Sequence, residues 1–157
     1  MDIPARFALI NDNRKIYRGG QPNETHIKML TEKGIKTIIN LRKEDLTQRR
    51  EERKLCEKYG IEYIEFPFYG IFGFSPDFVH EVIDKIHKMS EKGPIYIHCL
   101  NGRDRTSVMV ASYFVKYENK NSTLAWIEDV IKYDHDENDK YYSKFKTSFQ
   151  EFCDKLK

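Results

Sequence analysis

The stretch Pro94-Ile-Tyr-Ile-His-Cys-Leu-Asn-Gly-Arg-Asp-Arg-Thr-Ser107 decides the fold of this chain. Its first six residues form a short apolar run rich in β-formers, which is typical of a buried strand. Apolar residues from Val108 to Val115 then recur at helical spacing and predict a buried helix. In open α/β sheets, ligands bind where such strands end and their helices begin. We therefore expect the loop that starts at Cys99 to lie at the carboxyl end of a central strand.

The rest of the chain alternates strand-like and helix-like segments. Three further strands are expected at 16–18, 35–41 and 61–66, and the last of them is followed by a loop that contains Pro67. Helices are expected at 22–33, 44–59, 76–89, 108–115, 122–133 and 142–156. This alternation predicts one α/β domain over residues 1–157, with three layers and a central, mostly parallel sheet of about four or five strands flanked by helices.

Composition excludes several classes of protein. The chain has 157 residues, of which 39% are hydrophobic and 33% are charged, so it resembles an ordinary globular protein rather than a disordered one. A net charge of +2 is too small to predict a nucleic-acid partner. No apolar run approaches membrane-spanning length and Met1–Pro4 lacks a signal-peptide pattern, so we expect no integral membrane segment and a cytoplasmic location. Export without a classical signal would leave no readable mark, and nothing in the sequence indicates the oligomeric state.

The loop brings together the groups needed for chemistry on a phosphate. Cys99 is a candidate nucleophile, whose thiolate would be stabilised by loop N–H groups, by a helix N-terminus and by Arg105. Arg105 can hold two phosphate oxygens in a fork. Gly102 allows the turn, and the hydroxyl of Thr106 or Ser107 can bond to the sulfur. The residues expected to contact substrate are Leu100, Asn101, Gly102, Arg103, Asp104 and Thr106.

The segment His98-Cys-x5-Arg-Thr resembles the phosphate-binding loop of the cysteine-dependent protein tyrosine phosphatase superfamily. Tyr17-Arg-Gly-Gly-Gln-Pro22 and Ile38-Ile-Asn-Leu-Arg42 are similar to elements of small bacterial and plant-fungal atypical dual-specificity phosphatases, and order and spacing agree over residues 15–118. The resemblance implies a two-step mechanism in which Cys99 attacks phosphorus and water then hydrolyses the cysteinyl phosphate. It implies no metal and no other cofactor.

The general acid is harder to identify. Many relatives place an aspartate on a loop about thirty residues before the cysteine, but the stretch 67–75 contains no carboxylate. Asp104 is the better candidate, because the loop is also similar to that of myotubularin-like phosphatases, in which this aspartate is a proposed acid. Asp104 could instead cap the following helix. Asp77, the alternative acid, could simply be a first-turn helix residue, and Glu65 could face solvent from its strand.

Two substrate classes stay open. Arg103 would favour substrates with more than one phosphate, such as inositol phosphates or phosphoinositides, or it could be an ordinary surface arginine. The aromatic residues Phe68, Tyr69, Phe72 and Phe74 could wall the pocket around a phosphotyrosine ring, or belong to the core or to a lid. We therefore predict a phosphatase acting on a phosphorylated protein or on an inositol phosphate.

Two other functions compete with this prediction: a catalytically weak phosphate-binding module without an effective acid, and a sulfurtransferase of rhodanese type. Of the other cysteines, Cys56 and Cys153 fall at helical positions where burial is expected. His98 is expected to orient the loop through its ring nitrogens, and Gln21 and Arg42 could lie near the sheet's carboxyl edge. The acidic run at 134–139 could suggest a metal site but is more typical of a solvated turn.

Overall fold

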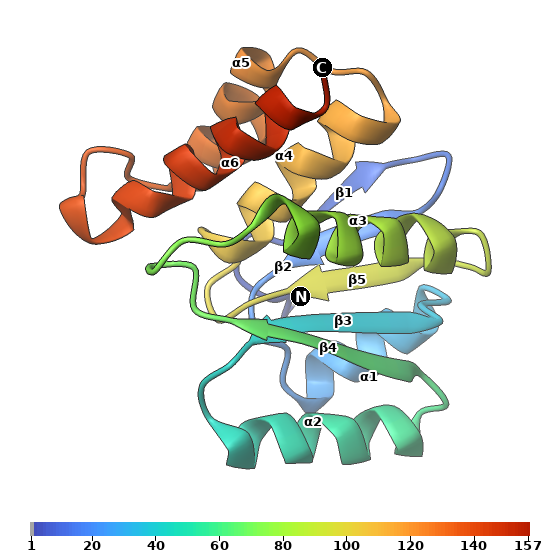
Figure 1. Cartoon of the computed structure of the whole chain (residues 1–157). Helices are drawn as coiled ribbons and strands as arrows, with labels where there is room; N and C mark the ends of the chain where they lie inside the picture. Colours follow the sequence, from blue (N-terminus) through green and yellow to red (C-terminus); the bar gives the residue numbers. More distant parts are fainter. Residues whose placement is uncertain (1) are drawn as a thin grey trace.

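A computed structural model describes residues 2–157 and places the decisive strand in the middle of a five-stranded sheet (Figure 1). The strands are β1 (Ala8–Asn11), β2 (Ile16–Gly19), β3 (Thr37–Arg42), β4 (Glu62–Phe68) and β5 (Ile95–His98). Their order is β1-β2-β5-β3-β4, and all neighbours are parallel except β1 and β2. The predicted α/β class with a mostly parallel sheet is confirmed.

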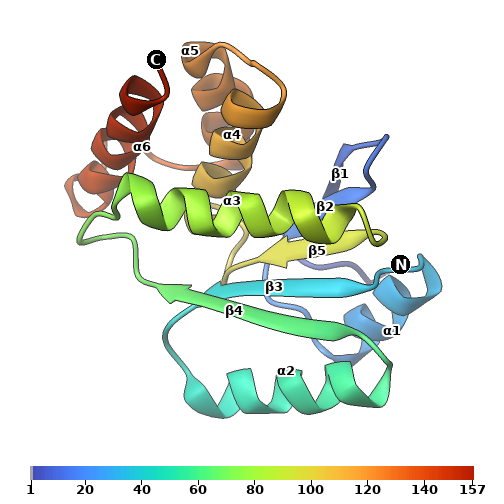
Figure 2. The ribbon, with the colours of Figure 1, turned by 45° about the vertical axis from the view of Figure 1, so that its right-hand side comes forward.

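Helices cover both faces of the sheet, giving three layers (Figures 1 and 2). One face carries α1 (Glu24–Glu32) and α2 (Leu46–Lys58), and the other carries α3 (Pro76–Ser90), α4 (Arg105–Tyr117), the short α5 (Ser122–Ala125) and α6 (Ser143–Lys155). Among residues 2–157, none of the helices combines the length and the apolarity needed to cross a membrane.

Three expectations about elements need correction. Edge strand β1 is only four residues long and has no strong pattern, so the sequence did not predict it. Pro67 lies inside β4 rather than in the following loop, which is tolerated because β4 is an edge strand and needs no N–H there. The helix expected over 122–133 is not regular: after α5 it continues as a π-helix over Trp126–Val130 and a 3-10 turn over Ile131–Tyr133.

The two central strands separate two hydrophobic cores. In β3, Ile39 packs toward α3, α4 and α6, whereas Ile38 packs toward α1 and α2. In β5, Ile97 packs toward the core that contains Ile39, and Tyr96 packs toward the core that contains Ile38. All four side chains are fully buried. Burial on both faces explains why these strands are apolar runs rather than alternating ones. The loop that follows β5 is therefore anchored to a strand that is buried on both faces.

Register determines which segments surround that loop. His98, the last residue of β5, pairs with Gly19 at the end of β2 and with Asn40 near the end of β3. The residues that continue from β2 and β3 consequently flank the loop on its two sides. The site is built from these three strand ends.

Candidate active site

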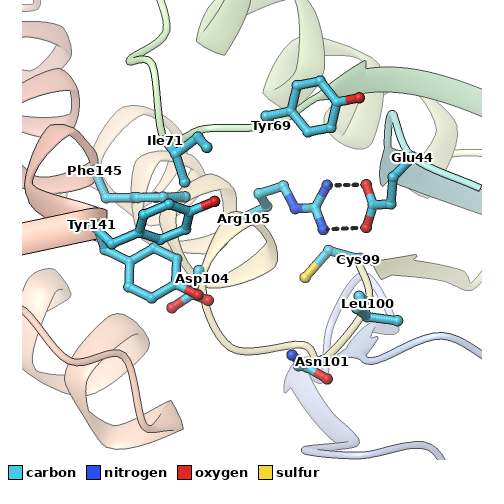
Figure 3. Close-up of a pocket in the computed structure, with 11 residues that line it drawn as sticks. Glu44, Tyr69, Ile71, Cys99, Leu100, Asn101, Asp104, Arg105, Tyr141 and Phe145 are labelled. Atoms are coloured by element: carbon cyan, nitrogen blue, oxygen red, sulfur yellow. Dashed lines mark hydrogen bonds and ion pairs between the residues drawn. The ribbon is translucent and has the colours of Figure 1, made fainter. Parts of the chain in front are cut away.

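A cavity of about 240 Å³ opens beside Cys99 at the carboxyl end of β5 (Figure 3). Cys99 is 2% exposed, and Figure 3 shows it with Arg105 between Glu44 on one side and Asp104 on the other. The residues that line the cavity are Glu44, Tyr69, Ile71, Cys99, Leu100, Asn101, Asp104, Arg105, Tyr141, Tyr142 and Phe145. The loop residues Leu100, Asn101 and Asp104 thus face this space as expected, whereas Gly102, Arg103 and Thr106 are not among its lining residues.

Three successive carbonyls of the loop are held from behind. Leu100 O accepts from the backbone N–H of Gln21 at 2.9 Å, and Asn101 O accepts from Arg6 Nη1 at 3.1 Å. Gly102 O accepts from Arg18 Nη2. In a trans peptide the N–H points opposite to the carbonyl. The amides that follow these carbonyls therefore point the other way, as a cradle for an anion requires.

Gly102 and the end of β2 fit closely together. Gly102 has a φ of +65°, and a Cβ at this position would lie 2.5 Å from the backbone carbon of Gly19. Gly20 faces the loop as well, since a Cβ there would lie 2.9 Å from Leu100 O. Gly19 at the end of β2 and Gly20 after it thus allow the loop to approach, and Gly102 provides the left-handed turn predicted for it.

Arg18 supports the loop from the core. It is fully buried, its guanidinium lies 3.7 Å from the centre of the Tyr133 ring, and burial lowers its pKa to about 10. Besides Gly102 O it reaches Ser107 Oγ at 3.1 Å. The Thr106 hydroxyl is buried and has no hydrogen-bond partner among residues 2–157, so it is not bonded to the sulfur, whereas Ser107 Oγ accepts from Arg18 and keeps its own proton free to donate.

Arg105 is oriented by Glu44. Its Nη1 and Nη2 donate to the two carboxylate oxygens of Glu44 at 2.8 and 2.9 Å, and Nη1 also reaches Phe68 O at 3.0 Å. The hydrogen bond from Arg105 lowers the pKa of Glu44 to about 2. An arginine has a second two-donor edge, formed by Nε and Nη2. With Glu44 on the terminal edge, this side edge is the one left to bind phosphate.

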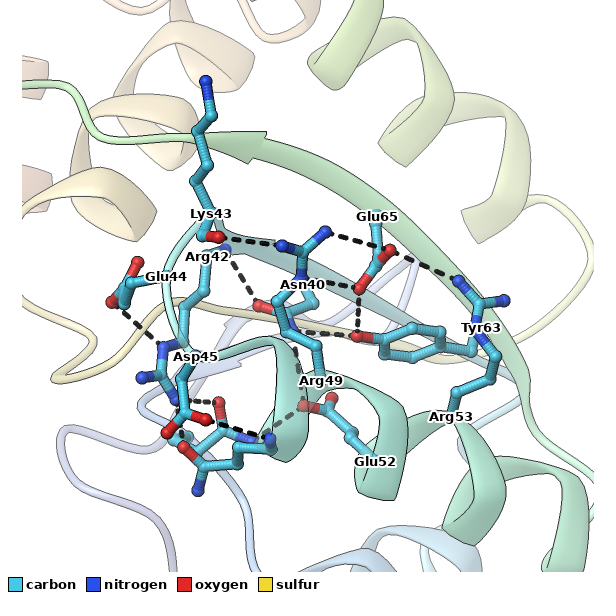
Figure 4. Close-up of polar contacts among 12 residues, drawn as sticks. Asn40, Arg42, Lys43, Glu44, Asp45, Arg49, Glu52, Arg53, Tyr63 and Glu65 are labelled. Carbon is cyan, nitrogen blue, oxygen red and sulfur yellow. Dashed lines mark hydrogen bonds and ion pairs between the residues drawn. The ribbon is translucent and has the colours of Figure 1, made fainter.

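A buried polar chain holds Glu44 in turn (Figure 4). Arg42 donates to Glu44 at 3.0 Å and to Gln21 at 2.7 Å, and Gln21 donates to Glu52 at 2.7 Å. Glu52 is 2% exposed and lies 2.6 Å from His98 Nε2, while His98 Nδ1 lies 3.0 Å from Cys99 O. His98 makes the ring contacts expected of it, and Gln21 and Arg42 connect it to the arginine side of the pocket.

The carboxylates proposed as acids have very different surroundings. Asp104 is the N-cap residue of α4, but among residues 2–157 its side chain makes no capping hydrogen bond. It accepts instead from His135 Nδ1 at 2.8 Å. Asp77 is exposed on α3 and is not among the residues lining the cavity, and Glu65 is engaged by Arg49 at 3.0 Å. Of the three, Asp104 alone lines the cavity.

The aromatic wall comes mainly from residues that sequence reasoning missed. Of the four predicted aromatics only Tyr69 lines the cavity, since Phe68 and Phe74 pack into the core and Phe72 is 80% exposed. The other aromatic residues that line the cavity come from the C-terminal segment: Tyr141, Tyr142 and Phe145. Tyr142 and Phe145 fall within the helix expected over 142–156, but nothing in the sequence indicated that they would reach the pocket.

Cys56 and Cys153 are buried as expected, and burial raises their pKa values to about 12 and 11. Two carboxylates of the acidic run 134–139 are engaged by other groups of the protein, one of them distant in sequence. Asp134 pairs with Arg6 at 2.9 Å, and Asp139 accepts from the backbone N–H of Tyr141 at 2.9 Å.

Residues 7–151 match the family of dual-specificity-type phosphatase domains described as "DSP-PTPase phosphatase fused to NAD+ Kinase". The chain belongs to this family. The match is to a phosphatase and not to a sulfurtransferase, and it covers the strand ends, the loop and the aromatic wall described above.

Curated relatives are longer than this chain. It is 33% identical over 122 residues to a probable chloroplastic NAD kinase 2 of Oryza sativa, an alignment covering 71% of this chain and 12% of that protein. It is 29% identical over 112 residues to the inositol diphosphatase DSP4 of Arabidopsis thaliana, covering 68% of this chain and 54% of that one. The chain therefore spans about an eighth and about half of these two relatives.

Solved structures share the fold over almost the whole chain. A DUF442 protein of Shewanella putrefaciens superposes with a TM-score of 0.78 at 20% identity, covering 97% of this chain and 91% of that one. A cysteine-to-serine variant of Pseudomonas aeruginosa TpbA in complex with phosphotyrosine has a TM-score of 0.74 at 18% identity, covering 98% and 96%. Both agree with the three-layer arrangement seen here.

Proposed function

We propose that this chain is a phosphatase that hydrolyses phosphate monoesters through a cysteinyl-phosphate intermediate, with Cys99 as nucleophile and Arg105 as phosphate-binding residue. The observation that carries the proposal is the position of Cys99 beneath a cradle of inward-facing amides and next to an arginine already oriented by Glu44. A module that only binds phosphate would need no thiol at this position.

The reaction proceeds in two displacements. The thiolate of Cys99 attacks phosphorus, the sulfur–phosphorus bond forms and the bond to the leaving oxygen breaks. Asp104 gives its proton to that oxygen. Water then attacks phosphorus, its proton passes to Asp104, and the sulfur leaves as thiolate. The loop amides and Arg105 stabilise the charge that develops on the phosphoryl oxygens in both steps.

The preferred substrate is an aryl phosphate such as phosphotyrosine. Among the lining residues Arg105 is the one cation, and it faces two carboxylates, Glu44 and Asp104. A substrate with several phosphates would bring further negative charge against these carboxylates. Two cations outside the cavity lining stack on aromatic residues that line it. Arg103 Cζ lies 5.6 Å from the ring centre of Tyr142, and Lys43 Nζ lies 5.5 Å from that of Tyr69. Aromatic walls suit the ring of a phosphotyrosine.

A substrate panel tests both parts of the proposal. Residues 1–157 are assayed as one catalytic unit on a phosphotyrosyl peptide and on inositol hexakisphosphate, beside Cys99→Ser. We expect kcat/KM to be higher for the peptide by about tenfold or more, and we expect the variant to be inactive. Phosphate release by Cys99→Ser would overturn the mechanism. Equal or faster turnover of the inositol phosphate would overturn the substrate preference.

A further inference from the structure

His135 contacts the loop carboxylate from a distant part of the chain. It follows the 3-10 turn over Ile131–Tyr133 and is separated from Asp104 by 31 positions. Its Nδ1 lies 2.8 Å from Asp104 Oδ1, and its side chain is fully buried. Nothing in the two-step mechanism above uses this contact. A buried histidine directed at a pocket carboxylate therefore needs an explanation of its own.

The surroundings of the ring determine which nitrogen carries the proton. His135 packs against Trp126, Tyr142 and Phe145, with ring centres 5.4, 6.0 and 5.5 Å away. Its Nε2 is buried and has no hydrogen-bond partner among residues 2–157. A proton on Nε2 would be an unsatisfied donor in an apolar site. A neutral ring with its proton on Nδ1 donates to Asp104 and leaves only a lone pair facing the aromatic rings.

His135 also distinguishes between the two carboxylate oxygens. Arg103 Nε lies 3.4 Å from Oδ1 and 3.3 Å from Oδ2 of Asp104, so this long contact does not favour either oxygen. His135 binds Oδ1, and Oδ2 remains the oxygen free to carry a proton. A carboxyl group that accepts at one oxygen can still hold a proton on the other.

The segment that carries His135 is tied to the loop at a second point. Arg6 Nε donates to Asp134 at 2.9 Å, and Arg6 Nη1 donates to Asn101 O at 3.1 Å. One arginine thus bridges the residue before His135 to the residue three positions before Asp104. This bridge helps to hold the imidazole of His135 next to the carboxylate of Asp104.

We propose that His135 is a positioning residue that holds Asp104 as the general acid, by donating from Nδ1 to Oδ1 and leaving Oδ2 to protonate the leaving oxygen. The inference rests on the proposed phosphatase activity. The proton balance involves Asp104 alone. Oδ2–H loses its proton to the leaving oxygen in the first step and regains one from the attacking water in the second, while His135 keeps its Nδ1 proton throughout.

Leaving-group dependence tests this role, because a general acid matters most when the leaving oxygen is strongly basic. Phenyl phosphate and 4-nitrophenyl phosphate are compared in the wild type, His135→Phe and Asp104→Asn. Phenylalanine fills the aromatic site but cannot donate. For both variants we expect kcat on phenyl phosphate to fall by about tenfold or more, with a much smaller fall on 4-nitrophenyl phosphate. The melting temperature and the Kd for vanadate should stay close to the wild-type values.

Two further variants distinguish positioning from packing. Asparagine can place an amide N–H near the position of Nδ1, so His135→Asn should retain the wild-type leaving-group dependence, whereas the longer His135→Gln should not. The double variant His135→Phe/Asp104→Asn should be no slower than Asp104→Asn, since both changes remove one function. Equal losses on the two esters, or additive losses in the double variant, would overturn the proposal. An inactive wild type would instead contradict the phosphatase function itself.

Discussion

At the scale of single residues, Glu44 decides how the pocket arginine is presented. Both Nη atoms of Arg105 are bound to its carboxylate, and Arg42 holds the same carboxylate from the other side at 3.0 Å. An arginine fixed in this way loses little conformational freedom when it binds phosphate. The side chain just after β3 is therefore as much a part of the site as the loop itself.

Replacing Glu44 by Gln should change the pH dependence of stability. The pKa of Glu44 is lowered from 4.5 to about 2 in the folded protein, principally by the Arg105 hydrogen bond. A carboxyl with a depressed folded pKa stabilises the fold above its unfolded pKa and loses that contribution as the pH falls through the folded value. Glu44→Gln should therefore melt lower than the wild type at pH 7. Thermal unfolding in phosphate-free buffer should show the melting temperatures of the variant and the wild type converging as the pH falls from 4.5 to 2. A difference in melting temperature that stays constant over this range would contradict the assignment.

Arg105→Lys should lower kcat/KM by about a hundredfold on any phosphate ester, because an ammonium cannot make two parallel bonds to the phosphate while pairing with Glu44. Arg103→Lys is the matched control, since Arg103 does not line the cavity. Steady-state kinetics on one ester measure both. Equal losses in the two variants would mean that general positive charge, and not the fork of Arg105, binds the phosphate.

At the scale of elements, the loop between β5 and α4 depends on its fit against the end of β2. Backbone carbonyls of Leu100, Asn101 and Gly102 are bound by Gln21, Arg6 and Arg18. Each of these partners precedes α1 in the chain. The N-terminal segment consequently acts as the template that holds the anion cradle open.

Gly102→Ala tests this fit against Gly34→Ala. Both glycines have positive φ, +65° and +84°, so each substitution costs about 1 kcal/mol of backbone strain. A Cβ at Gly34 meets nothing within 4 Å, whereas one at Gly102 would lie 2.5 Å from the Gly19 backbone. We expect Gly102→Ala to lose more stability than Gly34→Ala in denaturant unfolding, because only its Cβ meets backbone, and we expect vanadate affinity to fall by about tenfold or more in Gly102→Ala alone. Unchanged affinity in Gly102→Ala would show that the loop tolerates displacement from β2.

At the scale of the whole molecule, the pocket is closed by a segment that is remote in sequence from the nucleophile. The loop supplies the floor, and Tyr141, Tyr142 and Phe145, around the start of α6, supply one wall (Figures 1 and 3). Helix α6 packs on α3 and α4, and its Phe145 and Phe149 belong to the larger core. The C-terminal helix therefore contributes both to the lining of the cavity and to the hydrophobic core.

Tyr141→Ala should raise KM for a phosphotyrosyl peptide about fivefold, because Tyr141 lines the cavity and can pack on the substrate ring. Its side chain is 62% exposed, so little stability should be lost. Phe72→Ala is the control: Phe72 is 80% exposed and does not line the cavity. Steady-state kinetics measure KM for both variants. An equal rise in KM for Tyr141→Ala and Phe72→Ala would show that Tyr141 does not contact the substrate.

Much of this site is local in sequence and could be read directly. The strand, the left-handed glycine and the following helix are consecutive, and their periodicity and composition predict them without reference to other segments. Cys99 and Arg105 belong to the same run, so the superfamily was recognisable. Burial of Cys56 and Cys153 followed from helical spacing in the same way.

Contacts between distant segments could not be read in this way. Glu44 meets Arg105 across 61 positions and His135 meets Asp104 across 31, and no local pattern encodes either pair. Asp104 shows the difference most clearly. Its sequence position left two roles open, acid and helix cap, and the packing of residues 131–145 places His135 beside its carboxylate, which makes no capping hydrogen bond.

The sequence by itself thus determined the α/β class and the strand-loop-helix run that carries the proposed nucleophile and the proposed phosphate cradle, because these depend on backbone preferences of adjacent residues. The tertiary structure alone decided which carboxylates reach the pocket, which edge of Arg105 is free and which aromatic rings line the cavity. Those features depend on how the helices pack on the sheet. Such packing brings together residues that are far apart in the chain, and their separation in sequence does not predict their distance in space.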